Sequence, residues 1–240
     1  MPQMFIFFCG PPFCGKSTQT QKVLEAFKDF RLLSSSNIIN DRKNFNVLTQ
    51  TEDEGKQLTI KEILDRGWYV DAPTVLKLLK NEIETFAGAP IISDSYPRSV
   101  IQLGDLESKL GVKLSLIFYL HASDEKTHKK IFERRRADRR VCPTCRVNYD
   151  PKTNPAADGK CATDGAHLEI KFDDMGELPL KRLESYMKNA APMAEVLKNY
   201  PGFVDVVIDI DGKEIPPDEI FSKQILPAIT KMVSPLKAFA

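Results

Sequence analysis

The stretch Gly10 to Ser17 reads GPPFCGKS and directly follows an apolar run, Met4 to Cys9, that reads MFIFFC. It satisfies the pattern G-x-x-x-x-G-K-[ST], in which a glycine-rich turn joins a buried strand to a helix. The backbone N–H groups of such a turn point at phosphate oxygens, and the N-terminus of the following helix adds positive charge. Lys16 then supplies a point charge at the β- and γ-phosphates, and Ser17 or Thr18 faces Mg²⁺. The sequence therefore predicts a nucleotide-phosphate loop rather than a surface turn.

Strands and helices alternate along the rest of the chain. Apolar runs predict further buried strands at 90–93, 114–120 and 203–210. Apolar residues at helical spacing predict helices at 17–30, 58–64, 75–83, 124–136, 180–197 and 217–233. This alternation is typical of an α/β fold with a parallel sheet. Residues 137–173 break the pattern, because they hold turn formers, three cysteines and few apolar residues. We expect a metal-stabilised segment or a lid there.

Charge and composition narrow the class of protein. The 240 residues include 34 Lys and Arg against 33 Asp and Glu, which gives a formal net charge of +1. This balance argues against a protein whose whole surface binds nucleic acid, and no apolar run approaches the roughly 20 residues that span a bilayer. The five cysteines are odd in number and unevenly spaced, and the N-terminus lacks a signal-peptide pattern. We therefore expect a cytoplasmic protein with reduced thiols and with no membrane or nucleic-acid partner.

A second polar motif closes the predicted strand at 90–93. It runs from Asp94 to Arg98, DSYPR, and Gln102 follows four residues later. An acid at the C-terminal end of a buried strand suits a Mg²⁺-bound water beside a phosphate loop. Arg98 has the fork geometry to bind a second phosphate group. A proline turn with a surface arginine explains this motif equally well when it is taken alone.

Three cysteines and one acid form two short knuckles within 137–173. The spacing C-x2-C-x15-C-x2-D places Cys142 and Cys145 in the first knuckle and Cys161 and Asp164 in the second. Two knuckles at this separation suit one tetrahedral Zn²⁺ with four protein ligands, which is a structural site. The other candidates for the fourth ligand are His167 and Asp158. A redox CxxC pair and a zinc ribbon that binds nucleic acid are the alternative interpretations.

Four stretches, GPPFCGKSTQ, DSYPRSVIQ, RRADRRVCPTCRVNYD and KFDDMGELPLKRL, occur in that order along the chain. Their order and separation resemble those of the adenylate kinases with a long lid. The resemblance implies a P-loop NTPase fold, in which helices flank a parallel-sheet core that carries a helical monophosphate-binding insertion and a small zinc-binding lid. The implied parts are a core of residues 1–33, 74–136 and 174–240, a monophosphate-binding domain at 34–73, and a lid at 137–173.

The same resemblance implies a reaction. The expected enzyme transfers the γ-phosphoryl group of ATP to AMP and gives two ADP, with Mg²⁺ on the ATP and Zn²⁺ in the lid. We expect it to act as a monomer. A kinase for another nucleoside monophosphate and a non-catalytic, ATP-binding relic of a kinase are the alternatives. A zinc-ribbon protein that binds nucleic acid is disfavoured by the charge balance.

Phosphoryl transfer between two nucleotides concentrates negative charge, so catalysis depends on positioning and charge neutralisation. Arg135 and Arg139 lie four residues apart near the end of a predicted helix and can share one face. In the family that they resemble, such a pair reaches the ATP phosphates, and further arginines serve the AMP phosphate and the transition state. The implied catalytic residues are Lys16, Arg98, Arg135, Arg139, Lys171 and Arg182. The neighbouring arginines 134, 136 and 140 are expected to form a solvated basic patch.

The resemblance also implies the contacts of each nucleotide. For ATP these are Gly10, Pro11, Pro12, Phe13, Cys14, Gly15, Lys16, Ser17, Thr18, Arg135, Arg139, Asn148 and Tyr149. For AMP these are Ser35, Asn40, Lys43, Trp68, Tyr69, Val70, Ser95, Tyr96, Arg98, Gln102, Lys171 and Arg182. Asp94 is expected to hold the Mg²⁺ ion through water.

The chain departs from the family pattern on the AMP side. Asn40 stands where the family usually has a phosphate-binding arginine. Arg42 lies two residues on, about 200° around a helix, and is expected to face away, whereas Lys43 can reach back to the same face. Lys171 replaces a lid arginine, while Gln102 resembles the glutamine that contacts adenine. We expect these departures to weaken AMP binding more than ATP binding.

Overall fold

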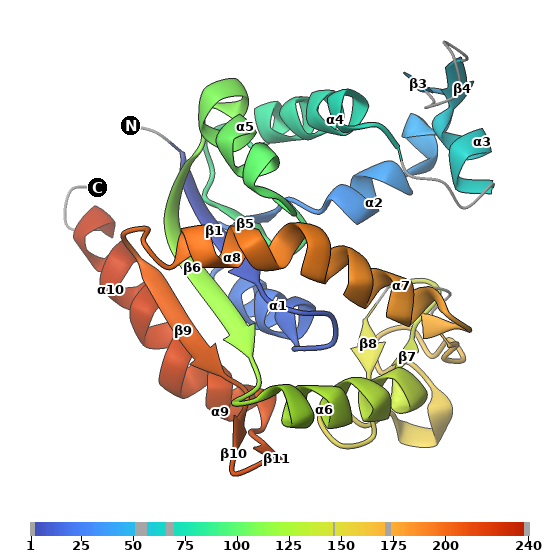
Figure 1. The fold of residues 1–240 in the computed structure, drawn as a ribbon, viewed down its shortest axis with the longest axis vertical. Helices are drawn as coiled ribbons and strands as arrows, with labels where there is room; N and C mark the ends of the chain where they lie inside the picture. Colours follow the sequence, from blue (N-terminus) through green and yellow to red (C-terminus); the bar gives the residue numbers. More distant parts are fainter. Residues whose placement is uncertain (1–2, 51–56, 66–69, 146, 171–173, 238–240) are drawn as a thin grey trace.

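A computed structural model describes residues 3–50, 57–65, 70–145, 147–170 and 174–237. Its centre is a five-stranded parallel sheet in the order β2-β5-β1-β6-β9 (Figure 1). The strands are β1 (Met4–Cys9), β2 (Arg31–Leu32), β5 (Ile91–Ser93), β6 (Lys113–His121) and β9 (Phe203–Val207). The predicted parallel-sheet α/β fold is thereby confirmed.

β1 is apolar without alternation because both faces of the sheet are covered. Phe5 and Phe7 belong to one apolar cluster, with residues of α4 (Ala72–Thr85), α5 (Val100–Leu110) and α8 (Ala191–Leu197). Ile6 and Phe8 belong to the other cluster, with residues of α1 (Lys16–Ala26), α6 (Glu125–Asp138), α9 (Pro217–Ile220) and α10 (Leu226–Lys237). The strand that leads into the phosphate loop is therefore fixed from both sides.

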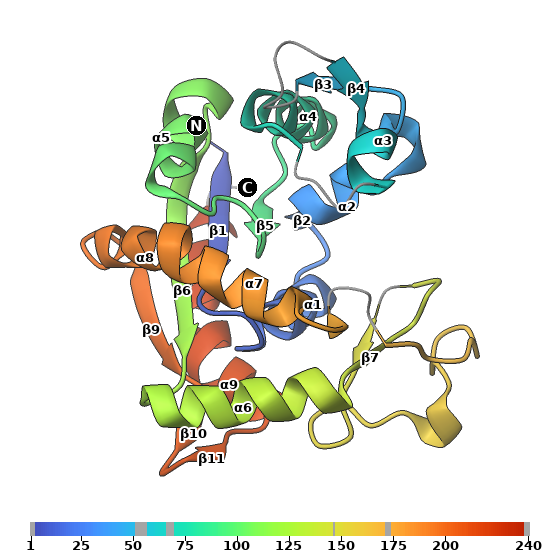
Figure 2. The same cartoon turned by 45° about the vertical axis from the view of Figure 1, so that its right-hand side comes forward.

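Two excursions leave the core on the same side of the sheet (Figure 2). The first joins β2 to α4 and contains α2 (Ser35–Ile39), η1 (Arg42–Asn44), β3 (Leu48–Gln50), β4 (Gln57–Thr59) and α3 (Ile60–Asp65). The second joins α6 to α7 (Leu178–Ser185) and contains β7 (Arg140–Val141), β8 (Asn148–Tyr149) and η2 (Ala157–Gly159). It has a small core of its own, in which Cys142, Tyr149 and Cys161 are buried. We call the described residues 139–170 the lid segment.

Several elements differ from the sequence-based prediction. The short strands β2, β3 and β4 and the helix α5 were not predicted. The prediction of one strand over 203–210 is wrong at its end, because β10 (Asp209–Ile210) turns away and pairs with β11 (Lys213–Glu214). The turn is stabilised by Asp209, whose carboxylate accepts hydrogen bonds from Ser123 and Gly212.

The two long predicted helices contain π-helical segments near their prolines. These segments are η4 (Tyr186–Ala190), just before Pro192, and η5 (Phe221–Ile225), just before Pro227. Proline lacks the N–H that an α-helix needs and clashes with the preceding turn, and a wider turn relieves both problems. Each predicted helix is therefore a chain of shorter segments. No helix among the described residues has the length and apolar character that crossing a bilayer requires.

Gly10 is where the sheet and the phosphate loop meet. Its φ is +131°, and a Cβ added there would lie 2.0 Å from the carbonyl oxygen of Leu120 on β6. We predict that Gly10→Ala lowers the free energy of unfolding by about 3 kcal/mol, because it combines backbone strain with a clash against a backbone atom. Denaturant titration measures this change.

Gly104→Ala is the matched control. Gly104 lies inside α5, and a Cβ there meets nothing within 4 Å. This change should raise the free energy of unfolding by roughly 0.5–1 kcal/mol through helix propensity. Equal stabilities of the two variants would contradict the close contact at Gly10.

Candidate active site

The loop from Gly10 to Gly15 joins β1 to α1, as the motif predicts. Gly15 is the N-cap of α1 and has a φ of +95°. Lys16 folds back over the loop, since its Nζ donates hydrogen bonds of 2.8 Å to the carbonyl oxygens of both Gly10 and Pro11. Ser17 and Thr18 lie in the first turn of the helix, and Ser17 is exposed. The loop thus presents one ammonium group and a helix N-terminus at the same place, which suits an anion.

Phe13 gives the loop two further contacts. Its φ is +65°, a left-handed conformation that is rare for a bulky residue. Its ring packs edge-on against Phe132 of α6, with the ring centroids 5.0 Å apart, and the Arg139 guanidinium lies over the same ring at 4.4 Å. Its carbonyl oxygen accepts a 2.8 Å hydrogen bond from Nη1 of Arg135. Both arginines predicted for ATP therefore lie against the phosphate loop.

Buried carboxylates hold these arginines. Nε and Nη2 of Arg135 donate to one oxygen of Glu214 at 3.0 and 2.7 Å. Nε of Arg139 donates to Asp174 at 2.7 Å, and its Nη2 bonds the second oxygen of the same carboxylate. The Asp174 side chain has no exposed area, and its Oδ1 lies 3.9 Å from Nη1 of Arg182. Asp174 thus brings together two arginines that were predicted to serve different nucleotides.

Several predicted AMP residues meet where β5 ends and α2 begins. The Ser35 N–H donates to the Ser95 hydroxyl at 2.9 Å, and the Ser35 hydroxyl donates to the Ser95 carbonyl at 3.3 Å. Nε of Arg98 donates to that carbonyl at 2.7 Å, and Nη2 donates to the hydroxyl of Ser36 at 3.4 Å. Gln102 accepts the Arg98 N–H at 2.7 Å. Ser35, Ser95, Arg98 and Gln102 therefore form one connected group.

Asp94 precedes this group at the end of β5. Because β5 pairs with β1, with Ile92 opposite Ile6, Asp94 and the phosphate loop leave neighbouring strands in the same direction. Tyr96 differs from the other members of its motif, because its ring is buried in the core. Burial, helped by the charge of Asp105, raises the pKa of the Tyr96 hydroxyl to about 12. The side chain of Tyr96 thus packs in the core rather than at the surface of the group.

The placement of Arg42 and Lys43 on a helix with Asn40 is wrong. Helix α2 ends at Ile39, and Arg42–Asn44 forms a separate turn because the Asp41 carboxylate accepts the Lys43 N–H at 3.0 Å. The Lys43 ammonium lies 3.2 Å from Asp41 and 3.6 Å from Glu82 of α4. Lys43 is thus paired with acids of the insertion and of α4.

Asn40 itself caps the C-terminus of α2. Its Nδ2 donates to the Ser36 carbonyl oxygen at 2.8 Å, and the hydroxyl of Ser36 is the one that Arg98 contacts. Ser36 therefore links position 40 to Arg98. Val70 packs against the core cluster. The other predicted AMP residues Trp68, Tyr69 and Lys171 lie outside the described residues.

The four predicted metal ligands form one cluster. Their ligand atoms, three sulfurs and a carboxylate oxygen, all lie within 4.8 Å of one another. Sγ of Cys142 lies 3.2 Å from an oxygen of Asp164, and Sγ of Cys145 lies 3.4 Å from Sγ of Cys161. Among the described residues, neither His167 nor Asp158 belongs to such a cluster. The geometry therefore favours Asp164 as the fourth ligand of a metal such as zinc.

Tyr149 belongs to this cluster rather than to the surface. Its ring is buried, its hydroxyl donates to Sγ of Cys161 at 3.3 Å, and the same hydroxyl accepts the Ala162 N–H at 2.8 Å. The Tyr149 side chain is thus part of the lid core, which leaves its backbone and Asn148 for the predicted ATP contact.

A sequence-family model described as adenylate kinase matches residues 8–201. The chain belongs to the adenylate kinase family. It is 32% identical over 216 residues to an adenylate kinase of Thermoanaerobacter sp. (strain X514). The aligned residues cover 88% of this chain and 92% of that protein. Adenylate kinases of Petrotoga mobilis and Caldanaerobacter subterraneus subsp. tengcongensis are each 30% identical. The alignment with the Petrotoga mobilis protein covers 88% of this chain and 91% of that protein. The alignment with the Caldanaerobacter protein covers 91% of this chain and 93% of that protein. Members of this family are nucleoside monophosphate kinases.

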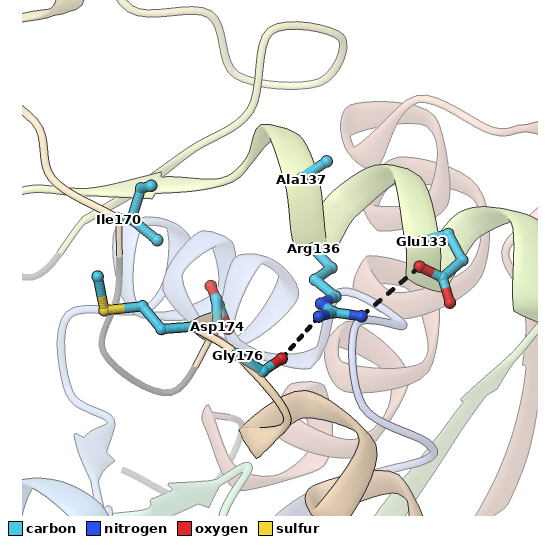
Figure 3. Close-up of a pocket in the computed structure, with 7 residues that line it drawn as sticks. Glu133, Arg136, Ala137, Ile170, Asp174 and Gly176 are labelled. Atoms are coloured by element: carbon cyan, nitrogen blue, oxygen red, sulfur yellow. Dashed lines mark hydrogen bonds and ion pairs between the residues drawn. The ribbon is translucent and has the colours of Figure 1, made fainter.

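In this adenylate kinase family member, a groove of about 520 Å³ separates the end of α6 from the segment that leads into α7 (Figure 3). Arg136 bridges the groove, because its Nη2 donates to the Gly176 carbonyl oxygen at 2.6 Å and its Nη1 lies 3.8 Å from Glu133. Asp174 lines the same groove. The groove therefore lies between the two connections that join the core to the lid segment.

Two acids of the site, and the packing of two arginines, do not follow from the sequence patterns. Asp174 and Glu214 were not among the predicted site residues, although Asp174 lies in the family-like stretch KFDDMGELPLKRL. The prediction that Arg134 and Arg136 form a solvated patch is wrong. Arg134 forms a two-bond pair with Glu214, and Arg136 bridges the groove. Arg134 is held by an acid 80 residues away in the chain, which no local charge pattern reveals.

Proposed function

We propose that the chain catalyses the reversible transfer of the γ-phosphoryl group from ATP to AMP, which gives two ADP. The observation that supports this most strongly is the grouping of cations at the loop. Lys16 lies inside the loop, Arg135 and Arg139 contact Phe13, and Arg182 shares Asp174 with Arg139. Such a grouping neutralises the charge of a phosphate chain and of the group in transfer.

The same proposal places the two nucleotides at the ends of neighbouring strands, ATP after β1 and AMP after β5. The ATP phosphates lie against Gly10–Gly15 and the start of α1 and against Arg135 and Arg139. AMP lies at the group of Ser35, Ser95, Arg98 and Gln102, which is anchored at the neighbouring strand β5. The proposal divides the protein into a core of residues 1–33, 74–136 and 174–240, an AMP-binding domain of residues 34–73 and a lid of residues 137–173. The protein acts as a monomer in the cytoplasm.

Mg²⁺ fits the donors at the end of β5 and at the start of α1. The Asp94 carboxylate, acting through water, and the exposed Ser17 hydroxyl are hard oxygen donors, which suit this ion. When bound with ATP, Mg²⁺ would neutralise part of the phosphate charge. The chain's own part is to orient the phosphates with Lys16 and the loop, and to exclude water when the lid segment covers them.

Zn²⁺ is the ion that best suits the cluster of Cys142, Cys145, Cys161 and Asp164. Around a tetrahedral zinc with Zn–S bonds of about 2.3 Å, neighbouring sulfurs are about 3.8 Å apart. The Sγ atoms of Cys145 and Cys161 lie 3.4 Å apart, close to that spacing. With four protein ligands the site is structural, because no coordination position remains for chemistry.

We predict that the purified protein contains one zinc per chain. Removal of the metal with a chelator should lower the melting temperature, with the lid segment losing its structure first, because the segment has only a small apolar core. Elemental analysis and hydrogen exchange of residues 139–170 measure these effects. Protein that holds neither zinc nor another transition metal, and that melts identically with and without chelator, would refute the site.

We predict that Lys16→Ala abolishes ADP formation from ATP and AMP and leaves the fold intact. The ammonium is the group that lies inside the loop, and the loss of one such charge slows phosphoryl transfer by roughly 10²-fold or more. A coupled assay of ADP formation across nucleoside monophosphates measures both the rate and the acceptor. If the Lys16→Ala variant stays active, the ATP phosphates bind elsewhere. If the unmodified protein is active with another nucleoside monophosphate but not with AMP, the phosphate acceptor is that other nucleotide.

We predict that Asn40→Arg lowers the KM for AMP by roughly tenfold and leaves the KM for ATP unchanged. Position 40 shares Ser36 with Arg98, so a guanidinium there adds a charge-assisted hydrogen bond to the AMP phosphate. Lys43→Ala is the control, since Lys43 pairs with Asp41 and Glu82, and it should leave the KM for AMP nearly unchanged. If Lys43→Ala raises that KM strongly, Lys43 already binds the phosphate.

A further inference from the structure

The β10–β11 hairpin carries an acid that the proposed reaction does not use. Glu214 on β11 accepts hydrogen bonds from Arg134, at 2.8 and 2.9 Å, and from Arg135, at 3.0 and 2.7 Å. Its side chain is only 6% exposed. We infer that Glu214 is a positioning residue for the ATP site, because it holds Arg135 against the phosphate loop. This inference rests on the proposed function, which assigns Arg135 to ATP.

Three of the five N–H groups of Arg135 are used by these contacts. Nε and Nη2 each donate one to Glu214, and Nη1 donates one to the Phe13 carbonyl oxygen. The guanidinium lies on the loop itself, since a Cβ added to Gly15 would be 3.3 Å from Nη1. The remaining N–H groups of Nη1 and Nη2 can donate to phosphate oxygens. Because Arg135 is already fixed, binding ATP costs little of its side-chain freedom.

Glu214 stays ionised under physiological conditions, so its hold on Arg135 persists. Burial alone would raise the pKa of its carboxyl group. The hydrogen bonds from Arg134 and the charge of Arg135 outweigh burial and lower the pKa to about 2. Two guanidinium groups offset the cost of burying the negative charge of Glu214, and one guanidinium group alone would offset less of it.

Arg134 provides the internal comparison, because it shares the carboxylate but not the loop. Its Nη1 donates to both oxygens of Asp150 in the lid segment, at 3.0 and 2.9 Å. Arg134 therefore joins α6 to the hairpin through Glu214 and to the lid segment through Asp150, whereas Arg135 contacts Phe13. If Glu214 only stabilised the fold, the loss of either arginine contact would have the same consequence. If it positions Arg135, loss of Glu214 weakens ATP binding, whereas loss of Arg134 does not.

The test uses the full chain and the near-isosteric change Glu214→Gln. We expect the KM for ATP, and the Kd for ATP measured by calorimetry without AMP, to rise roughly tenfold. The KM for AMP should stay within about twofold. Arg134→Gln should lower the melting temperature and leave the affinity for ATP nearly unchanged. In an Arg135→Ala background, Glu214→Gln should no longer alter the affinity for ATP, because the two residues act as a unit.

Two results would overturn the inference. One is a Glu214→Gln variant with unchanged ATP affinity, and the other is an effect that persists in the Arg135→Ala background. If Glu214→Gln does not fold, Glu214→Asp keeps the charge but moves it one methylene away, and it should give an intermediate loss of ATP affinity. Calorimetry measures ATP binding without ADP formation, so it tests this inference independently of the proposed reaction. A chain that binds ATP but forms no ADP contradicts the reaction, while the Glu214 comparison still decides the inference.

Discussion

The close approach of the Leu120 carbonyl oxygen to Gly10 fixes where the phosphate loop begins. A Cβ at position 10 would lie 2.0 Å from that oxygen, so only glycine lets β1 end beside β6 and turn into the loop. The apolar run of β1, packed on both faces, holds the turn in place. Lys16, the N-terminus of α1 and the unusual backbone of Phe13 follow from this turn, and Phe13 is where Arg135 and Arg139 meet the loop.

Two buried acids complete the arrangement. Asp174 binds Arg139 and lies near Arg182, and Glu214 binds Arg134 and Arg135. Arginines gathered around one loop repel one another, and an ionised acid between each pair offsets that repulsion and sets the orientation of each guanidinium. The orientation of these arginines is therefore set by acids of the chain itself. Preorganised charge of this kind is the usual source of rate enhancement in phosphoryl transfer.

The sequence was sufficient for the parts that depend on local patterns. The glycine and lysine spacing located the loop, the apolar runs located β1, β5 and β6, and the knuckle spacing brought Cys142 and Asp164 into one cluster. It was insufficient where contacts join distant segments. Glu214 is 79 residues from Arg135, and the helical-wheel argument for Lys43 failed because Asp41 starts a new turn. No local pattern reports which acid packs against which arginine.

We conclude that one group of cations, held in place by acids of the chain, receives the phosphates of ATP and the group in transfer to AMP. A crystal structure with a bisubstrate analogue, in which a chain of phosphates links two adenosines, tests it most directly. We expect the phosphates to lie against the loop Gly10–Gly15 and the start of α1, within hydrogen-bonding distance of Lys16, Arg135, Arg139 and Arg182. We expect Glu214 still to bind Arg135. A phosphate chain that lies outside the loop, or an Arg135 that leaves Glu214 to reach it, would contradict the account.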